Sequence, residues 1–323
     1  MLEHIGYKSR ILASVMVVFT LWASTAIAGV NEDFIEAAGR GDLHAVESYI
    51  AKGANVNAKM NNGETALSIA SENGHKEVVQ LLLAKEADVN AKTNDGVTAL
   101  IATSQNGSKE VVQLLLAKGA DVNAKMNNGE TALFMASQNG HKEVVQLLLA
   151  KGADVNVKKD NGVTALFMAS QNGHKEVVQL LLAKGADVNV KRDDGTTALI
   201  IASQQGHKEA VQLLLAKGAD VNVKRDNGAT ALISASQNGY KEVVQLLLAK
   251  GGDVNLKANN GVTALISASK KGHKEVVQLL LAKGADVNAK ANDGVTALIM
   301  ASQQGHKEVV QMLIRAGAKK SQD

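Results

Sequence analysis

The chain has 323 residues, no cysteine, no proline and an aromatic share of only 2%. The absence of cysteine excludes a disulfide framework, thiolate metal centres and thiol catalysis. Its 35 basic and 32 acidic residues give a formal charge of +3. This balance is too even for nucleic acid or an anionic membrane to be the expected partner. So few large rings also argue against one large conventional core.

The first 28 residues have the pattern of an export segment. Lys8 and Arg10 form a charged start, and residues 11–23 are an apolar run. Ala-Ile-Ala at residues 26–28 is the small-x-small pattern that precedes signal-peptidase cleavage. We expect cleavage after Ala28, which makes the mature protein periplasmic or secreted.

An uncleaved membrane anchor is the alternative, because residues 11–28 approach the ~20 residues that a membrane-spanning helix needs. Four hydroxyl side chains weaken this interpretation: Ser14, Thr20, Ser24 and Thr25. No second hydrophobic span follows in the sequence. We therefore expect no membrane association once the segment is removed.

Residues 29–59 are expected to form an N-terminal capping repeat. They end in Gly-Ala-Asn-Val-Asn at residues 53–57, which matches the Gly-Ala-Asp-Val-Asn that recurs along the chain. The terminal repeat of a stacked array must present a polar outer face to water. This segment has the polar residues Asn31, Glu32, Asp33, Glu36, Arg40, Asp42 and Glu47.

A 33-residue period organises residues 60–323. Asn-Gly or Asp-Gly, one variable residue and Thr-Ala-Leu recur at equal steps, with the glycines Gly63, Gly96, Gly129, Gly162, Gly195, Gly228, Gly261 and Gly294. The period predicts eight repeats, at residues 60–92, 93–125, 126–158, 159–191, 192–224, 225–257, 258–290 and 291–323. Because most positions are identical between copies, the positions that differ are the candidates for function.

Each repeat predicts two short helices. In the repeat at residues 60–92, a turn signal precedes Thr65, a candidate N-cap, and a helix follows from Ala66 to about Glu72. An Asn-Gly pair breaks this helix, and a second apolar-faced helix runs from about Lys76 to Lys85. One such pair cannot bury its apolar side alone, so we expect a solenoid in which adjacent repeats stack.

A glycine such as Gly119 closes the second helix in later repeats, where a left-handed residue is favoured. The equivalent residue of the repeat at 60–92 is Glu86. We expect it to cost ~1 kcal/mol if that conformation is kept.

These repeats resemble the ankyrin repeat. The resemblance is carried by the period, the Asn-Gly-x-Thr-Ala-Leu entry, the Gly-His-Lys-Glu-Val-Val-Gln-Leu-Leu-Leu helix and the Gly-Ala-Asp-Val-Asn ending over residues 60–323. It implies an all-α ankyrin-repeat solenoid of nine stacked helix-turn-helix units with β-hairpin-like connecting turns. It also implies that the turn tips and first helices line a concave side that holds protein partners.

One departure from the family concerns its usual Thr-Pro-Leu-His. Here Thr-Ala-Leu is followed by Ser68, Ile101, Phe134, Phe167, Ile200, Ile233, Ile266 or Ile299. The lost proline only pre-set the first helical turn, which alanine also favours. The lost histidine removes a hydrogen bond that the resemblance implies, and we expect packing of the Ile and Phe side chains to compensate.

The last repeat is expected to be a weak cap, because Met312, Leu313 and Ile314 keep the internal pattern and only the residues from Arg315 onward are distinctly polar. A docking surface for another molecule is the alternative interpretation. We expect a monomer.

Six histidines occupy one repeated position: His75, His141, His174, His207, His273 and His306. Packed helices lie ~8–10 Å apart, whereas zinc needs ligand nitrogens at ~2 Å, so a shared metal row is disfavoured. We interpret the position as a structural polar residue at the start of the second helix, replaced by Ser108 and Tyr240 in two copies.

Catalytic motifs are absent from the sequence: there is no Ser-His-Asp set, phosphate-binding glycine loop or His-Glu-x-x-His. The carboxylates Asp193 and Asp194 are interpreted as turn residues. We expect no enzyme activity, no metal and no cofactor.

The residue that leads each turn tip varies between copies, as Met60, Thr93, Met126, Lys159, Arg192, Arg225, Ala258 and Ala291. Three consecutive tips are basic. We predict a partner-binding site formed by Lys159, Arg192, Arg225, Val163, Thr196, Ala229 and Met126. Exposed charge gives steering and specificity, so the expected partner is a protein with an acidic surface. Neutral drift at exposed positions is the alternative.

The sequence therefore predicts an exported protein–protein interaction module that binds its partner on the tip and first-helix face. A structural spacer without a specific partner is the first alternative. An enzyme, or an accessory to one, is the second.

Overall fold

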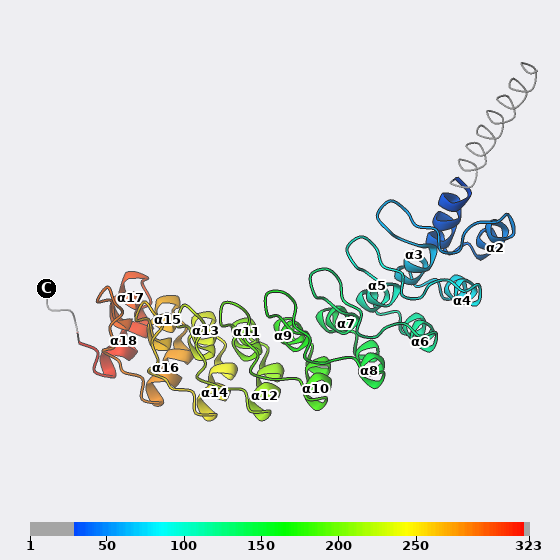
Figure 1. Cartoon of the computed structure of the whole chain (residues 1–323). Coiled ribbons are helices and arrows are strands. Elements are labelled where there is room, and N and C mark those ends of the chain that lie inside the picture. Colours follow the sequence, from blue (N-terminus) through cyan, green and yellow to red (C-terminus); the bar gives the residue numbers. More distant parts are fainter. Residues whose placement is uncertain (1–28, 320–323) are drawn as a thin grey trace, which may run out of the picture. The chain divides into compact units, whose positions relative to one another are not determined.

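The computed structural model describes residues 29–319 (Figure 1). The predicted export segment and its cleavage after Ala28 lie outside the described residues, as do residues 320–323. Contacts divide the chain into an N-terminal part that ends at Asn127 and a C-terminal part that begins at Asn128, and each is described by itself. Across residues 29–319, every helix is too short or too polar to cross a membrane.

Short helices separated by turns make up the N-terminal part. Residues 29–40 are helical. The helices that follow are α2 (Leu43–Ala51), α3 (Ala66–Glu72), α4 (Lys76–Ala84), α5 (Ala99–Asn106) and α6 (Lys109–Ala117). The two helices predicted from the repeat at residues 60–92 are confirmed as α3 and α4.

The C-terminal part continues the same alternation. Its helices are α7 (Ala132–Asn139), α8 (Lys142–Ala150), α9 (Ala165–Gln171), α10 (Lys175–Ala183), α11 (Ala198–Gln205), α12 (Lys208–Ala216), α13 (Ala231–Asn238), α14 (Lys241–Ala249), α15 (Ala264–Lys271), α16 (Lys274–Ala282), α17 (Ala297–Gln303) and α18 (Lys307–Arg315). Odd-numbered helices from α3 to α17 are called first helices and even-numbered ones second helices. First helices start 33 residues apart, as the period predicts.

A threonine begins every first helix from α3 to α17. Its hydroxyl accepts a hydrogen bond from the N–H three residues later, for example from Ile233 to Thr230 Oγ1 at 3.2 Å. This bond satisfies one of the donors that a helix start leaves without a partner. The predicted N-cap at Thr65 is confirmed, and the Ser68 hydroxyl accepts from the Thr65 N–H in return at 2.8 Å.

Left-handed residues follow the second helices. Gly119 has φ 86°. Glu86 keeps the same conformation with φ 63°, and within residues 29–319 no other non-glycine residue has a positive φ. The expected strain at Glu86 is therefore present, because its Cβ approaches the backbone in this region.

The core of each part lies between its two rows of helices. First helices pack on neighbouring first helices and on their own second helices. In the C-terminal part of Figure 1, the first helices and the turns form one row and the second helices form the other. Phe134 and Phe167, which stand where the family has histidine, are 4% and 3% exposed. Apolar packing therefore does replace the lost polar contact at these two positions.

Strand pairing in residues 29–319 is limited to isolated antiparallel bridges, which are Lys59–Thr65, Lys158–Thr164 and Lys191–Thr197. The β-hairpin-like turns expected from the resemblance are represented only by these bridges. The reason is the short distance along the chain to the next helix. Lys159 N donates to Val163 O at 2.9 Å, and the following Thr164 already caps α9.

Candidate functional site

The tips of three consecutive turns in the C-terminal part place Lys159, Arg192 and Arg225 at equivalent positions. Each tip is closed by its own backbone, since Arg192 N donates to Thr196 O at 2.9 Å. Adjacent tips are also joined, because Asp193 N donates to Asn161 O at 3.2 Å. These backbone hydrogen bonds fix the Cα position of each basic residue relative to its neighbours.

An apolar cluster lies on the first-helix side of these tips. Its buried members are Phe134, Val163, Phe167 and Ile201, and Met135 and Met168 pack against them while partly exposed. The cluster combines one turn residue, Val163, with residues of α7, α9 and α11. We call this cluster together with the three basic tip residues the tip surface.

Two of the basic side chains cover aromatic rings of the cluster. Lys159 Nζ lies 5.9 Å from the centroid of the Phe134 ring, and Arg192 Cζ lies 5.5 Å from that of Phe167. A cation at this distance from a ring face is attracted by the negative face of the π system. The sequence contains only four phenylalanines, and two of them form these pairs.

The same two cations are neutralised within the chain. Lys159 Nζ lies 2.6 Å from Glu130 Oε1. Arg192 Nε donates to Asp194 Oδ1 at 2.9 Å, and its Nη2 also contacts Asp194. The hydrogen bond from Arg192 is the main reason that the pKa of Asp194 lies well below its usual range. The bond to Asp194 likewise raises the pKa of Arg192.

Arg225 differs from its two equivalents. Its Nη2 donates to Gln204 Oε1 of α11 at 2.6 Å. This acceptor is an uncharged amide oxygen, not a carboxylate. Its Nε is buried and has no hydrogen-bond partner among the described residues. Burial lowers the pKa of Arg225, Asp194 acts in the opposite direction, and the charge of Arg192 lowers it further.

The other residues of the predicted site are less accessible than the sequence suggests. Val163 and Thr196 are 5% and 1% exposed, so their side chains support the tips from below and offer almost no surface to a partner. Ala229 is half-buried beside Arg225. Met126 is half-buried and lies in the N-terminal part, so it is not included in the tip surface.

Sequence comparison alone did not identify the partners that neutralise the tips. Glu130 lies one residue before the capping threonine of its repeat, and Asp194 lies three residues before that of its own repeat. This spacing does not predict which basic side chain either carboxylate pairs with. One signal was present in the sequence: phenylalanine occurs at residues 134 and 167, in the repeats that precede the tips of Lys159 and Arg192. This could have indicated that each basic side chain packs on a ring.

The histidine row has a structural role in the described residues. Nε2 of His174 donates to the main-chain oxygen of Gln138 at 2.9 Å, and His75, His207, His273 and His306 make the equivalent bond. A carbonyl oxygen only accepts, so Nε2 carries the hydrogen. These rings connect a second helix to the preceding repeat and do not cap their own helix. Within residues 29–319, no three His, Asp or Glu side chains are arranged to hold a metal ion.

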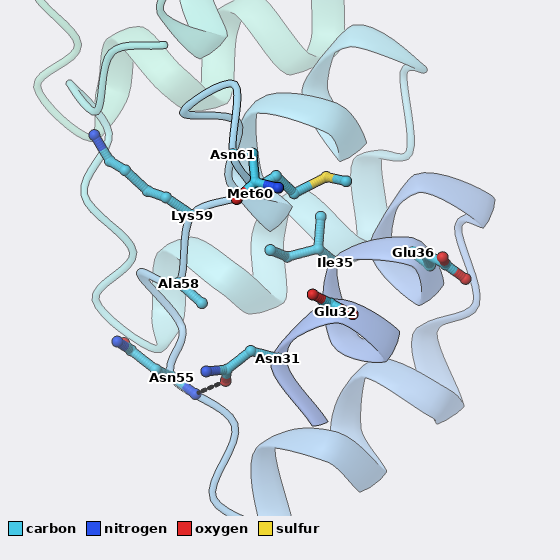
Figure 2. A pocket seen from close by; sticks show the side chains of 9 residues that line it. All are labelled: Asn31, Glu32, Ile35, Glu36, Asn55, Ala58, Lys59, Met60 and Asn61. Carbon is cyan, nitrogen blue, oxygen red and sulfur yellow. Dashed lines mark hydrogen bonds between the residues drawn. The ribbon is translucent and has the colours of Figure 1, made fainter. Parts of the chain in front are cut away.

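A pocket of about 350 Å³ opens at the start of the N-terminal part, between the helical residues 29–40 and the first turn. Figure 2 shows Met60 extending above Ile35, and Asn55 N donating to Asn31 Oδ1 at 2.8 Å. The Lys59 side chain extends toward the next repeat, where its Nζ donates a hydrogen bond to Lys92 O at 3.0 Å. The pocket therefore lacks a basic group directed into it.

A second pocket of the N-terminal part has a volume of about 230 Å³ and is lined by residues of the tips and first helices. Its charged residues are acidic, whereas the tips of the tip surface are basic. The pocket's acidic members are Glu64, Glu72 and Asp95, and its uncharged first-helix residues are Ser68, Ala102 and Gln105. The combination of basic tips with large apolar side chains is therefore a property of the tip surface and not of every repeat.

The comparisons with known proteins agree with this architecture. A family model described as ankyrin repeats, three copies, matches residues 34–126, 123–192, 185–258 and 250–323. None of the curated proteins compared with the chain matches it. Because the family model covers nearly all of the described residues, the chain belongs to the ankyrin-repeat family.

Proposed function

We propose that this chain is an exported protein–protein interaction module that binds a protein partner on its tip surface. Membership of the family supports the binding role, because ankyrin repeats are generally protein–protein interaction modules. In this proposal residues 29–59 are the N-terminal cap of eight further repeats, and the protein acts as a monomer in the periplasm or outside the cell.

One observation carries the choice of surface. Met135 and Met168 are partly exposed on the apolar cluster, beside cations that are held in place by Glu130 and Asp194. At the equivalent first-helix position the next repeats have Ile201, Ser234 and Ser267, and the last repeat has Met300, whose tip residue is Ala291 and carries no charge. Methionine is a flexible apolar contact residue, and binding sites combine an apolar centre with a polar rim.

A matched pair of variants tests the surface. The mature protein is used to retain a partner from the proteins of its own compartment, and retention of that partner is then measured for Met168→Lys and Gln179→Lys. Gln179 is exposed on α10, in the row of second helices, so it controls for the added charge. We expect Met168→Lys to abolish retention and Gln179→Lys to leave it unchanged, with both variants folded by thermal melting.

Two results would contradict the proposal. Equal retention by the two folded variants would move the binding site away from the tip surface. Failure of the mature protein to retain any partner would favour a spacer.

Export has a separate test. Intact-mass measurement of the exported protein should give a chain that begins at Gly29. A chain that begins at Met1, or a membrane-bound form, would contradict export with cleavage.

A further inference from the structure

Of the three basic tip residues, Arg225 alone has no carboxylate partner in the part of the chain that the structure describes. Lys159 is paired with Glu130, and Arg192 with Asp194. Within residues 29–319 no ion pair involves Arg225, and the only hydrogen bond of its side chain is to the amide oxygen of Gln204. The three residues are equivalent in sequence, but they have different electrostatic roles.

We propose that Arg225 binds the carboxylate of an Asp or Glu side chain in the partner, while Lys159 and Arg192 serve to cover and rigidify the apolar cluster. This inference rests on the proposed function, since it names the chemical group that the tip surface recognises. It replaces the expectation of three equivalent cations facing an acidic surface with one specific contact.

The first argument is the cost of burying an unpaired charge. Arg225 is half-buried and its Nε is fully enclosed, so part of its hydration is lost without an anion in return. A carboxylate is a stronger acceptor than the Gln204 amide oxygen, because hydrogen bonds between charged groups are shorter and stronger than neutral ones. The partner's carboxylate can therefore replace Gln204 Oε1 as the acceptor of the hydrogen bond from Arg225 Nη2.

The second argument is that Asp194 cannot supply this partner. Both of its carboxylate oxygens contact Arg192, and its Oδ1 also accepts from Thr196 N at 3.0 Å. Arg192, Asp194 and Arg225 therefore carry a net charge of +1 among them. That remaining charge is located on Arg225.

The third argument concerns the space beside Arg225. The two repeats before Arg225 contribute Met168 and Ile201 to the apolar cluster, whereas the first helix of its own repeat has the small Ser234 and the next tip has Ala258. Neighbouring repeats lie about 10 Å apart, and an extended chain advances about 3.3 Å per residue. A bound segment that crosses these repeats would place an apolar residue about three positions from its acidic residue.

A random-peptide display library selected on the exported protein tests the inference while the natural partner is unidentified. We expect the enriched peptides to contain an Asp or Glu about three residues from an apolar residue. The affinity of a synthetic enriched peptide is then measured for the unchanged protein and for the variants Arg225→Gln, Arg225→Lys, Met168→Lys, Lys159→Gln and Lys217→Gln. The same peptide with its Asp or Glu changed to the amide completes a double-mutant cycle.

Arg225→Gln and the amide peptide should each lower the affinity at least about tenfold, and together they should lower it no further. Arg225→Lys should recover only part of the affinity, because an ammonium lacks the two-pronged geometry of a guanidinium. Lys217→Gln is the matched control, since it removes a positive charge from an exposed residue at the end of α12, outside the tip surface. It should change the affinity less than about twofold. Lys159→Gln should lower the affinity less than Arg225→Gln does, because the charge of Lys159 is already paired with Glu130.

Two outcomes would overturn the inference in distinguishable ways. Peptides that lose affinity with Met168→Lys but not with Arg225→Gln or Arg225→Lys would disprove carboxylate recognition and leave the tip surface as the binding site. Peptides whose affinity is insensitive to both Met168→Lys and Arg225→Gln would disprove the tip surface as well. Thermal melting of each variant confirms that a lost affinity does not reflect unfolding.

Discussion

The Nε2 atom of His207 donates a hydrogen bond of 2.9 Å to the main-chain oxygen of Gln171, which lies 36 residues earlier in the preceding repeat. The ring also lies directly over the glycine of that repeat, since a Cβ at Gly173 would come within 2.5 Å of His207 Nδ1. One histidine thus ties two repeats together and restricts the residue beneath it to glycine.

Replacing His207 by alanine should lower the free energy of unfolding by roughly 1 kcal/mol, because the Gln171 carbonyl loses its partner within the repeat interface. Urea denaturation of the protein measures the change. His44→Ala is the matched control, since His44 is exposed on α2 and outside the repeated position. Equal effects of the two changes would show that the bond between repeats contributes nothing.

Gly173→Ala should be more destabilising than a glycine change without a ring above it. Both Gly173 (φ 73°) and Gly185 (φ 83°) are left-handed, but a Cβ at Gly185 would have no atom within 4 Å. Gly185→Ala should therefore cost about 1 kcal/mol, and Gly173→Ala should cost about 1–3 kcal/mol more because of the collision. In the double variant with His207→Ala, the collision part should disappear, which urea denaturation can detect.

Glu86→Gly should stabilise the protein by about 0.5–1 kcal/mol, because glycine adopts a φ of 63° without the strain that a side chain causes. The reverse change at the equivalent site, Gly119→Glu, should destabilise the protein by a similar amount. Urea midpoints of both variants provide the measurement. A loss of stability in Glu86→Gly would mean that the Glu86 side chain makes a contact worth more than the strain.

Lys159→Glu should destabilise the protein, because it places a carboxylate next to Glu130, which is now 2.6 Å from Lys159 Nζ. We expect a loss of roughly 1 kcal/mol in thermal or urea unfolding. The charge-swapped double variant Lys159→Glu and Glu130→Lys should recover most of that loss. Charge reversal of the tips is therefore not neutral for stability, and binding studies should use neutral replacements such as Lys159→Gln.

Asp194 should make stability depend on pH in acid. Its pKa is lowered in the folded protein, mainly by the hydrogen bond from Arg192. Ionised Asp194 therefore stabilises the folded state above the ordinary pKa of about 4, and this contribution is lost as the pH falls through the lower folded-state value. Urea midpoints of the unchanged protein and Asp194→Asn should differ at pH 7 and converge in acid. A difference that persists unchanged in acid would contradict this assignment.

Local structure followed from the sequence because its causes lie within one repeat. The threonine caps, the helix bounds at α3 and the left-handed Glu86 each depend on residues a few positions apart. Eight near-identical copies also made the period, and with it the all-helical repeat fold, recognisable from the sequence alone.

Contacts between repeats were decided only by the tertiary structure. The sequence made Lys159, Arg192 and Arg225 look equivalent, but their acceptors are Glu130, Asp194 and Gln204. Two of these acceptors belong to the preceding repeat, and the choice among them depends on side-chain rotamers and burial. Stacking likewise placed Val163 and Thr196 under the tips, where exposure depends on neighbouring repeats and not on the local pattern. The period determined the scaffold, whereas the tertiary structure determined which of the tip charges have a carboxylate partner.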